Sequence, residues 1–305
     1  MQKSLRYRLT FGPLMLAVLI GILELDLRIE HWTSGWIDAP QGRHGLGGVG
    51  LFVILMLLLP LATQELATLF SAEKVRPYRV LATIGSGLLT LHAFLTQFVW
   101  FQHIAATAFA FTLVLVMILA ALRRVWGKNT HEAITHMAGT VLATLYLGGL
   151  GWFLLALRVK HSYSPTGYQG STESILMILL TVKSADIGAF TFGSTLGRHK
   201  LIPWLSPKKS WEGLFGGILT SALVGLLCVK IWPHELATLN AAKALIFGGI
   251  LGAVGQAGDL LESLMKRDAE VKDSGSLIPG FGGVLDVIDS PLLAAPVAYL
   301  LFSWS

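Results

Sequence analysis

Residues 47–70 read GGVGLFVILMLLLPLATQELATLF, and this stretch decides the class of fold. It is apolar and long enough for one helix to cross the hydrocarbon core of a bilayer, which takes about 20 mainly apolar residues. Similar runs recur, separated by short segments with charged residues, Gly or Pro. We count nine, at residues 9–25, 47–70, 79–100, 102–122, 132–157, 171–193, 211–232, 241–262 and 284–303. The sequence therefore predicts an all-α, polytopic integral membrane protein with about nine transmembrane helices.

The composition agrees with a membrane location. Of the 305 residues, 53% are hydrophobic and only 13% are charged, whereas soluble domains carry roughly 25% charged residues. The mean hydropathy is +0.65. The narrowest break between two runs lies at residues 100–102. We expect the first run to be retained, because it lacks a clear small-residue cleavage site. A single cysteine, Cys228, excludes a disulfide framework within the chain.

The distribution of Lys and Arg predicts the orientation, because basic residues are retained on the cytoplasmic side. With the N-terminus inside, sixteen of the 23 basic residues fall in cytoplasmic segments: Lys3, Arg6, Arg8, Lys74, Arg76, Arg79, Arg123, Arg124, Lys128, Arg198, Lys200, Lys208, Lys209, Lys266, Arg267 and Lys272. The opposite side holds six: Arg28, Arg43, Arg158, Lys160, Lys230 and Lys243. We therefore expect the N-terminus inside and the C-terminus outside. A bacterial inner membrane is the expected location, with the active site facing the cytoplasm. The basic collar of the protein would face anionic headgroups or a polyanionic substrate.

The chain divides into two parts of different character. Residues 1–165 read as membrane scaffold, and residues 166–305 read as a catalytic membrane domain with a cytoplasmic polar site. The polar, Gly- and Pro-containing loop 161–172 separates them. One residue of the scaffold stands out, because Glu65 lies inside an apolar run, where an ionisable group is costly and faces a cavity or a partner. A structural and a functional role are equally open for it.

Two polar clusters of the second part lie in or beside cytoplasmic segments. Lys183 and Asp186 are three residues apart inside a span, so they share a helix face, and a buried ion pair is the simpler reading. The loop 198–213 places Lys209 and Ser210 directly before a helix start, where Ser206 and Ser210 offer N-cap oxygens. A helix N-terminus with adjacent lysines suits a phosphate. A capped helix whose lysines only set the orientation in the membrane would have the same sequence pattern.

A third cluster is harder to explain as scaffold. It contains Gln256, Asp259, Glu262, Ser263, Lys266, Arg267, Lys272, Asp273, Gly275, Gly280, Gly282, Gly283, Asp286 and Asp289. Four of its acids form two pairs with i, i+3 spacing, Asp259 with Glu262 and Asp286 with Asp289, so each pair falls on one helical face. Carboxylate oxygens are ligands for Mg²⁺, which shares its shell with substrate phosphates. Glycines let backbone amides approach an anion closely. Acids, bases and glycines together indicate phosphoryl or nucleotidyl transfer.

At these residues the sequence resembles the phosphatidate cytidylyltransferases, or CDP-diacylglycerol synthases. Every spacing of their signature is kept in Ser263, Lys266-Arg267, Lys272-Asp273, Gly275, Pro279-Gly280-Phe281-Gly282-Gly283 and Asp286-Val287-Ile288-Asp289. Two earlier segments also resemble family motifs: Asp186-Ile-Gly-Ala through Gly193, and Ser206-Pro-Lys-Lys209-Ser-Trp-Glu212-Gly213. The resemblance covers roughly residues 180–290. It departs at Phe281, where the family has His, and at Val287, where it has Arg; neither side chain binds metal or pairs with phosphate.

The resemblance implies a Mg²⁺-dependent nucleotidyltransferase whose substrates are CTP and phosphatidic acid. The implied catalytic residues are Asp259, Asp286, Asp289, Asp186 and Lys266, and the four acids among them are the expected metal ligands. The implied nucleotide and phosphate contacts are Lys209, Ser263, Arg267, Lys272, Asp273, Gly282 and Gly283. A second cation and a homodimer are compatible with the sequence, membrane lipids are expected neighbours, and no nucleic-acid partner is expected.

Three other functions stay open. Phe281 and Val287 leave room for a CTP-dependent lipid kinase, or for a cytidylyltransferase that acts on another lipid phosphate. The intramembrane acids would also suit the ion path of a cation transporter. An inactive scaffold is the third reading, and it is disfavoured because the acids are all retained.

Overall fold

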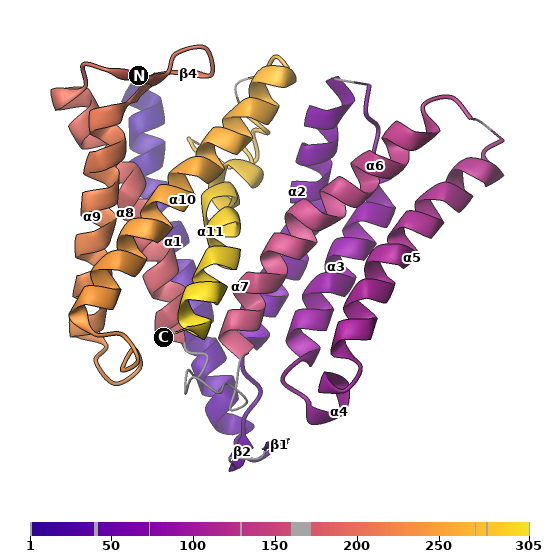
Figure 1. The fold of residues 1–305 in the computed structure, drawn as a ribbon, viewed down its shortest axis with the longest axis horizontal. Coiled ribbons are helices and arrows are strands. Elements are labelled where there is room, and N and C mark those ends of the chain that lie inside the picture. Colours follow the sequence, from indigo (N-terminus) through magenta and orange to yellow (C-terminus); the bar gives the residue numbers. More distant parts are fainter. Residues whose placement is uncertain are drawn as a thin grey trace. The chain divides into compact units, whose positions relative to one another are not determined.

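The computed structural model of the chain describes residues 2–39, 42–72, 74–128, 130–159, 172–271, 273–278 and 280–304. They form helices and two short β-hairpins (Figure 1). The helical elements are α1 (Gln2–Trp32), α2 (Val49–Ala72), α3 (Arg79–Leu95), α4 (Val99–Gln102), α5 (Ala105–Trp126), α6 (Ala133–Thr144), the π-turn η1 (Leu145–Gly149), α7 (Leu150–Val159), α8 (Thr172–Leu196), α9 (Trp211–Ile231), α10 (Ala241–Asp268) and α11 (Leu285–Ser303). The antiparallel strand pairs are β1 (Ile37–Ala39) with β2 (Gly42–His44), and β3 (Lys200–Ile202) with β4 (Ser206–Ser210).

Each of the nine apolar runs forms a helix. Within the described residues, eight helical segments are long and apolar enough to cross a membrane. The run 79–100 instead forms the 17-residue helix α3, followed by α4 in the expected narrow break. At about 1.5 Å per residue, α3 is shorter than the hydrocarbon core of roughly 30 Å. The all-α polytopic membrane fold is confirmed. The count of nine spans and the N-in, C-out orientation stay predictions.

The chain forms two compact units. The first comprises Met1–Val159 and Asp268–Val287, and the second comprises Lys160–Arg267 and Ile288–Ser305. Helix α11 therefore starts in the first unit and continues in the second. The polar loop 161–172, which suggested a division at residue 165, lies outside the described residues except for Thr172, so that division stays a prediction.

In the first unit, α3 packs against α2, α5 and α7. Small residues make this possible: a Cβ at Gly85 would lie 2.7 Å from Val116 of α5 and 2.9 Å from Thr144 of α6. Close backbone approach through small residues is the usual way in which membrane helices associate. The elements α6, η1 and α7 form one continuous span, Ala133–Val159, that contains a single π-turn.

In the second unit, the β3–β4 hairpin joins α8 to α9, which pack side by side (Figure 1). The hairpin ends at Ser210, whose Oγ accepts a hydrogen bond from the backbone amide of Gly213 at 3.2 Å. The N-cap expected at Ser210 is therefore confirmed. This cap fixes where α9 begins, and it places the last residues of β4 beside the polar end of α8.

Candidate functional site

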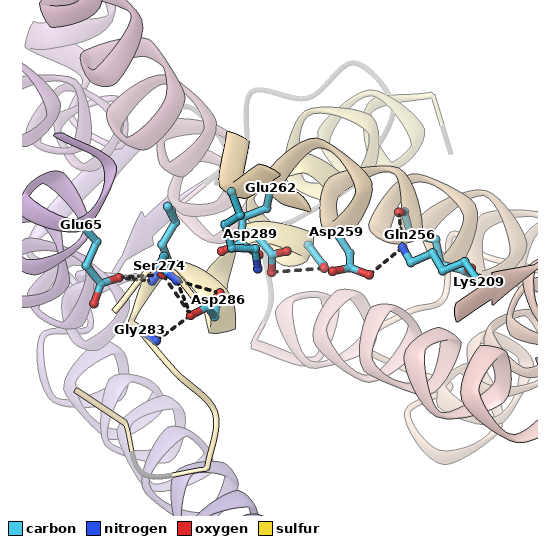
Figure 2. Close-up of polar contacts among 12 residues, drawn as sticks. Glu65, Lys209, Gln256, Asp259, Glu262, Ser274, Gly283, Asp286 and Asp289 are labelled. Atoms are coloured by element: carbon cyan, nitrogen blue, oxygen red, sulfur yellow. Dashed lines mark hydrogen bonds and ion pairs between the residues drawn. The ribbon is translucent and has the colours of Figure 1, made fainter. Parts of the chain in front are cut away.

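Three carboxylates from two helices meet in the second unit. Asp259 and Glu262 lie one turn apart on α10, and Asp289 lies early in α11 (Figure 2). One oxygen atom from each carboxylate lies within 4.8 Å of the other two. Glu262 is only 1% exposed and Asp289 only 2%. Oxygen ligands grouped in this way fit a hard divalent cation such as Mg²⁺.

A glycine on α10 allows the two helices to approach at this point. A Cβ at Gly258 would lie 3.1 Å from the Cα atom of Ser290 and 3.3 Å from the carbonyl oxygen of Asp289. A larger side chain would push the backbone of α11 away from α10. Gly258 therefore helps to hold Asp289 beside the acids of α10.

Two lysines offset part of the negative charge. The Nζ atom of Lys209 lies 2.6 Å from Oδ2 of Asp259 (Figure 2). The Nζ atom of Lys266 lies 2.7 Å from Oε2 of Glu262. Successive side chains of a strand point to opposite faces. Lys209 accordingly turns toward α10, whereas its neighbour Lys208 is exposed. The site thus combines ligands for a cation with positive partners for phosphate oxygens.

Asp186 lies beside this cluster. Its Oδ2 atom is 3.6 Å from Nζ of Lys183, so the expected ion pair on one face of α8 forms. Both side chains are about two-fifths exposed, so the pair is not buried as the simpler reading expected. Asp186 also interacts electrostatically with Asp259 and Lys209. Among the described residues, however, the group with ligand atoms close enough for one cation does not contain Asp186. Its role as a metal ligand stays a prediction.

Asp286 has a different environment from Asp289, although the two residues are one turn apart. Its Oδ2 atom accepts hydrogen bonds from the amide of Ser274 at 3.1 Å, from the hydroxyl of Ser274 at 3.0 Å and from the amide of Gly283 at 2.6 Å. These donors lie in the loop between α10 and α11. The carboxylate therefore shapes that loop, and its role as a metal ligand stays a prediction.

Glu65 of α2 binds the same loop. Its Oε1 atom accepts a hydrogen bond from the amide of Val284 at 3.0 Å, and its Oε2 atom accepts from the amide of Leu285 at 2.8 Å. The hydroxyl of Ser274 lies 3.3 Å from Oε2 (Figure 2). Glu65 is costly inside an apolar run, and the partners that satisfy its carboxylate lie more than 200 residues further along the chain.

The glycine-rich loop takes conformations that favour glycine. Gly280 and Gly282 have φ angles of +83° and +102°, a region that other residues rarely adopt. A Cβ at Gly282 would collide with the carboxylate of Asp286. The negatively charged groups that contact this loop in the structure are therefore carboxylates of the protein itself. The phosphate contacts expected of Gly282 and Gly283 stay predictions.

The other expected site residues surround these clusters in sequence. Ser263 is half-buried on α10, while Arg267 near the end of that helix and Asp273 in the following loop are exposed. Lys272 lies outside the described residues, as does Pro279 of the glycine-rich motif. The phosphate-binding roles that the resemblance implies for these residues stay predictions.

Phe281, where the resemblance would have a histidine, lies close to an apolar helix. An atom of its ring lies 3.4 Å from the position that a Cβ of Gly12 on α1 would occupy. An aromatic side chain suits such a contact, since it buries apolar surface without leaving a polar atom unpaired. Val287 lies in the first turn of α11, and no described contact explains its replacement of an arginine.

Two functional candidates were not among the expected site residues. The i, i+3 spacing put Glu262 on the same face as Asp259, yet Glu262 was not named as a ligand. Glu65 was marked as unusual, but no partner could be named for it. In both cases the missing information is which other element packs against that helix face.

Comparisons with known proteins agree on one family. A family model described as "Cytidylyltransferase family" matches residues 45–305. The uncharacterized protein YnbB of Escherichia coli (strain K12) is 38% identical over 49% of this chain and 50% of its own length. The phosphatidate cytidylyltransferase of Haemophilus influenzae is 34% identical over 63% of the chain and 64% of its own length. The phosphatidate cytidylyltransferase of Chlamydia pneumoniae is 31% identical over 96% and 90%, respectively. The chain thus spans about half to two thirds of the first two relatives.

Proposed function

The chain belongs to the cytidylyltransferase family, and we propose that it transfers CMP from CTP to phosphatidic acid. The products would be CDP-diacylglycerol and pyrophosphate. The observation that carries the proposal is the group of Asp259, Glu262 and Asp289, with Lys209 and Lys266 paired to two of the three carboxylates. Two of the relatives named above are phosphatidate cytidylyltransferases, which supports the same substrates.

In this reaction a phosphate oxygen of phosphatidic acid attacks the α-phosphorus of CTP. The bond from that phosphorus to the bridging oxygen breaks, and pyrophosphate leaves with the electron pair. Such a transfer depends on positioning and on charge neutralisation more than on covalent catalysis. The ammonium groups of Lys209 and Lys266 would stabilise negative charge on the reacting phosphates. Arg267 and Lys272 are proposed to bind the triphosphate or the lipid phosphate, with Ser263, Asp273, Gly282 and Gly283 as further contacts.

Mg²⁺ fits the oxygen ligands of this cluster, and we assign it to Asp259, Glu262 and Asp289. When bound, it would neutralise phosphate charge and align the attacking and leaving oxygens. Burial supports this assignment. Glu262 and Asp289 are almost fully buried and have oxygen atoms within 4.8 Å of each other, so they need compensating positive charge. Asp186 and Asp286 stay in the proposal as ligands of this ion or of a second cation.

The proposed site serves a lipid and a nucleotide from opposite directions. We place the enzyme in a bacterial inner membrane, with the site at the cytoplasmic ends of the spans. The acyl tails of phosphatidic acid would then stay in the bilayer while CTP arrives from the cytoplasm. A homodimer is compatible with this arrangement and is not required by it.

The proposal is tested with purified protein, phosphatidic acid, Mg²⁺ and CTP labelled in the cytosine ring. We expect label in a chloroform-soluble product, and we expect EDTA to abolish the transfer. Diacylglycerol in place of phosphatidic acid is the control and should take up no label. An absence of labelled lipid with phosphatidic acid would overturn the proposal.

A CTP-dependent lipid kinase is the second candidate, because Phe281 and Val287 differ from the signature of the synthases. The mass of the lipid product separates the two reactions. A kinase adds one phosphate to the lipid and releases CDP, whereas the synthase leaves the whole CMP unit on the lipid. A cytidylyltransferase for another lipid phosphate would show the same CMP gain on that other lipid.

A further inference from the structure

Glu65 is the acid of α2 whose function neither the family signature nor the proposed chemistry explains. Its hydrogen-bond partners among the described residues lie in the segment between α10 and α11 or at the start of α11. The amides of Val284 and Leu285 donate to its two oxygens at 3.0 and 2.8 Å, and the hydroxyl of Ser274 lies 3.3 Å from Oε2. The first amides of a helix have no partner within that helix. Glu65 therefore caps the start of α11 from another helix of the same unit.

Two glycines of the signature make room for this carboxylate. A Cβ at Gly275 would lie 2.5 Å from Oε1 of Glu65, and a Cβ at Gly283 would collide with Oε2 of Glu65 and with the hydroxyl of Ser274. Neither glycine has a positive φ angle, so backbone conformation does not require glycine at these positions. The close approach of Glu65 does.

The hydroxyl of Ser274 shows that the arrangement depends on both acids. It lies 3.0 Å from Oδ2 of Asp286 and 3.3 Å from Oε2 of Glu65, but it has a single proton to donate. The amide of Ser274 also donates to Asp286. The loop is thus held between a carboxylate from α2 and one from α11, each of which accepts from a different set of backbone amides.

We propose that Glu65 is a positioning residue of the transferase reaction. It holds residues 273–278 and 280–284 of the loop, together with the first turn of α11, in the shape in which this loop contacts the nucleotide. The inference rests on the proposed function, because the loop carries the residues assigned to CTP. In this role Glu65 acts through the loop and not by direct contact with the substrate. A carboxylate is needed here for two reasons. The side-chain amide of a glutamine carries no charge, and its NH₂ group, which is itself a donor, would face the donors of the loop.

The test compares Glu65→Gln and Glu65→Asp with Gln64→Ala, an exposed neighbour on the same helix turn. We expect Glu65→Gln to raise KM for CTP by up to about 100-fold, the loss that a misplacement of about 1 Å can cause, while KM for phosphatidic acid stays unchanged. Glu65→Asp should recover part of the loss because the charge is retained. Gln64→Ala should match the wild type in both constants.

Hydrogen exchange supplies a readout that needs no substrate. In Glu65→Gln, the amides of Gly283, Val284 and Leu285 should exchange faster than in the wild type, while peptides from α5 are unchanged. An unchanged KM for CTP with an intact fold would overturn the proposal. A lowered KM would also overturn it, because Glu65 would then be an internal anion that competes with CTP for the loop.

The two proposals fail in different ways. If the wild type transfers no CMP but Glu65→Gln still speeds exchange in this loop, the proposed reaction is wrong and the structural role of Glu65 stands. If the wild type is active but neither exchange nor KM responds to Glu65→Gln, the positioning role is wrong. Should Glu65→Gln fail to fold, Glu65→Asp provides both readouts.

Discussion

Asp289 carries a carboxylate that is almost fully buried beside two other acids. The substitution Asp289→Asn keeps the shape of the side chain and removes its charge. We expect kcat/KM for CTP to fall at least about 100-fold, as when one electrostatic contact to a reacting group is lost. Asp268→Asn, exposed at the end of α10, is the matched control, and both variants are assayed across a range of Mg²⁺ concentrations. Wild-type turnover of Asp289→Asn would contradict the metal assignment.

At the residue scale, the sequence predicted the acids better than their partners. Spacing places Asp259 and Glu262 on one face of a helix, and it does the same for Asp286 and Asp289. It does not say which element packs against that face. As a result, Asp289 joins the acids of α10, whereas Asp286 accepts hydrogen bonds from a loop. Only tertiary packing separates two acids that look equivalent in the sequence.

At the element scale, a buried ion pair links α1 to α7. An Nη2 atom of Arg158 lies 2.9 Å from Oδ2 of Asp26 and 2.6 Å from Oε2 of Glu30, and the side chains of Arg158 and Asp26 are 0% exposed. The amides of Gly48 and Gly50 also donate to Asp26, at 3.2 and 3.0 Å. One aspartate thus ties together α1, α7 and the start of α2.

Removal of the arginine should destabilise the fold strongly. In Arg158→Met the carboxylate of Asp26 stays buried without its cation, and breaking a buried pair in this way costs about 3–5 kcal/mol. The control is Arg28→Met, which removes an exposed arginine that lies 3.4 Å from Glu24; such pairs contribute about 0–1 kcal/mol. Unfolding in detergent, followed by circular dichroism, measures both. Equal stabilities of the two variants would refute the structural role of Arg158.

Close packing of α9 on α10 gives a second prediction at this scale. A Cβ at Gly225 would lie 2.6 Å from the carbonyl oxygen of Ala244 and 3.0 Å from the Cα atom of Gly248, whereas a Cβ at Gly249 would find ordinary contacts at 3.6 Å. Gly225→Ala should destabilise the protein by about 1–3 kcal/mol, the cost of overpacking. Gly249→Ala should be neutral or stabilising, because Ala favours helix over Gly. The reverse order in thermal unfolding would contradict this packing.

Hydropathy predicted where helices occur better than where they end. Helix α3 ends at Leu95, inside the apolar run 79–100. Just after this end, the side chain of Gln97 forms hydrogen bonds with backbone groups. Its Nε2 atom donates to the carbonyl oxygen of Phe94 at 2.8 Å, and its Oε1 atom accepts from the amide of Gly47 at 3.1 Å. Apolar residues continue on both sides of this turn, so average hydropathy does not reveal it.

At the scale of the whole molecule, labelling of single cysteines tests the predicted orientation of the chain in the membrane. Lys208 and His234 are exposed residues that flank α9, and the only native cysteine, Cys228, is buried. In a Cys228→Ser background, an impermeant maleimide should label His234→Cys in intact spheroplasts and Lys208→Cys only after the inner membrane is permeabilised. This result would agree with the positive-inside distribution of Lys and Arg. The opposite pattern would contradict the N-in, C-out orientation and a cytoplasmic site.

Two labels on CTP distinguish cytidylyl transfer to a lipid phosphate from phosphoryl transfer. Purified protein is incubated with phosphatidic acid, Mg²⁺ and CTP that carries ³²P at either the α or the γ position. We predict that the α label enters the chloroform-soluble lipid and that the γ label is released in water-soluble pyrophosphate in equal amount. Entry of the γ label into the lipid, with none from the α position, would contradict cytidylyl transfer and identify a lipid kinase.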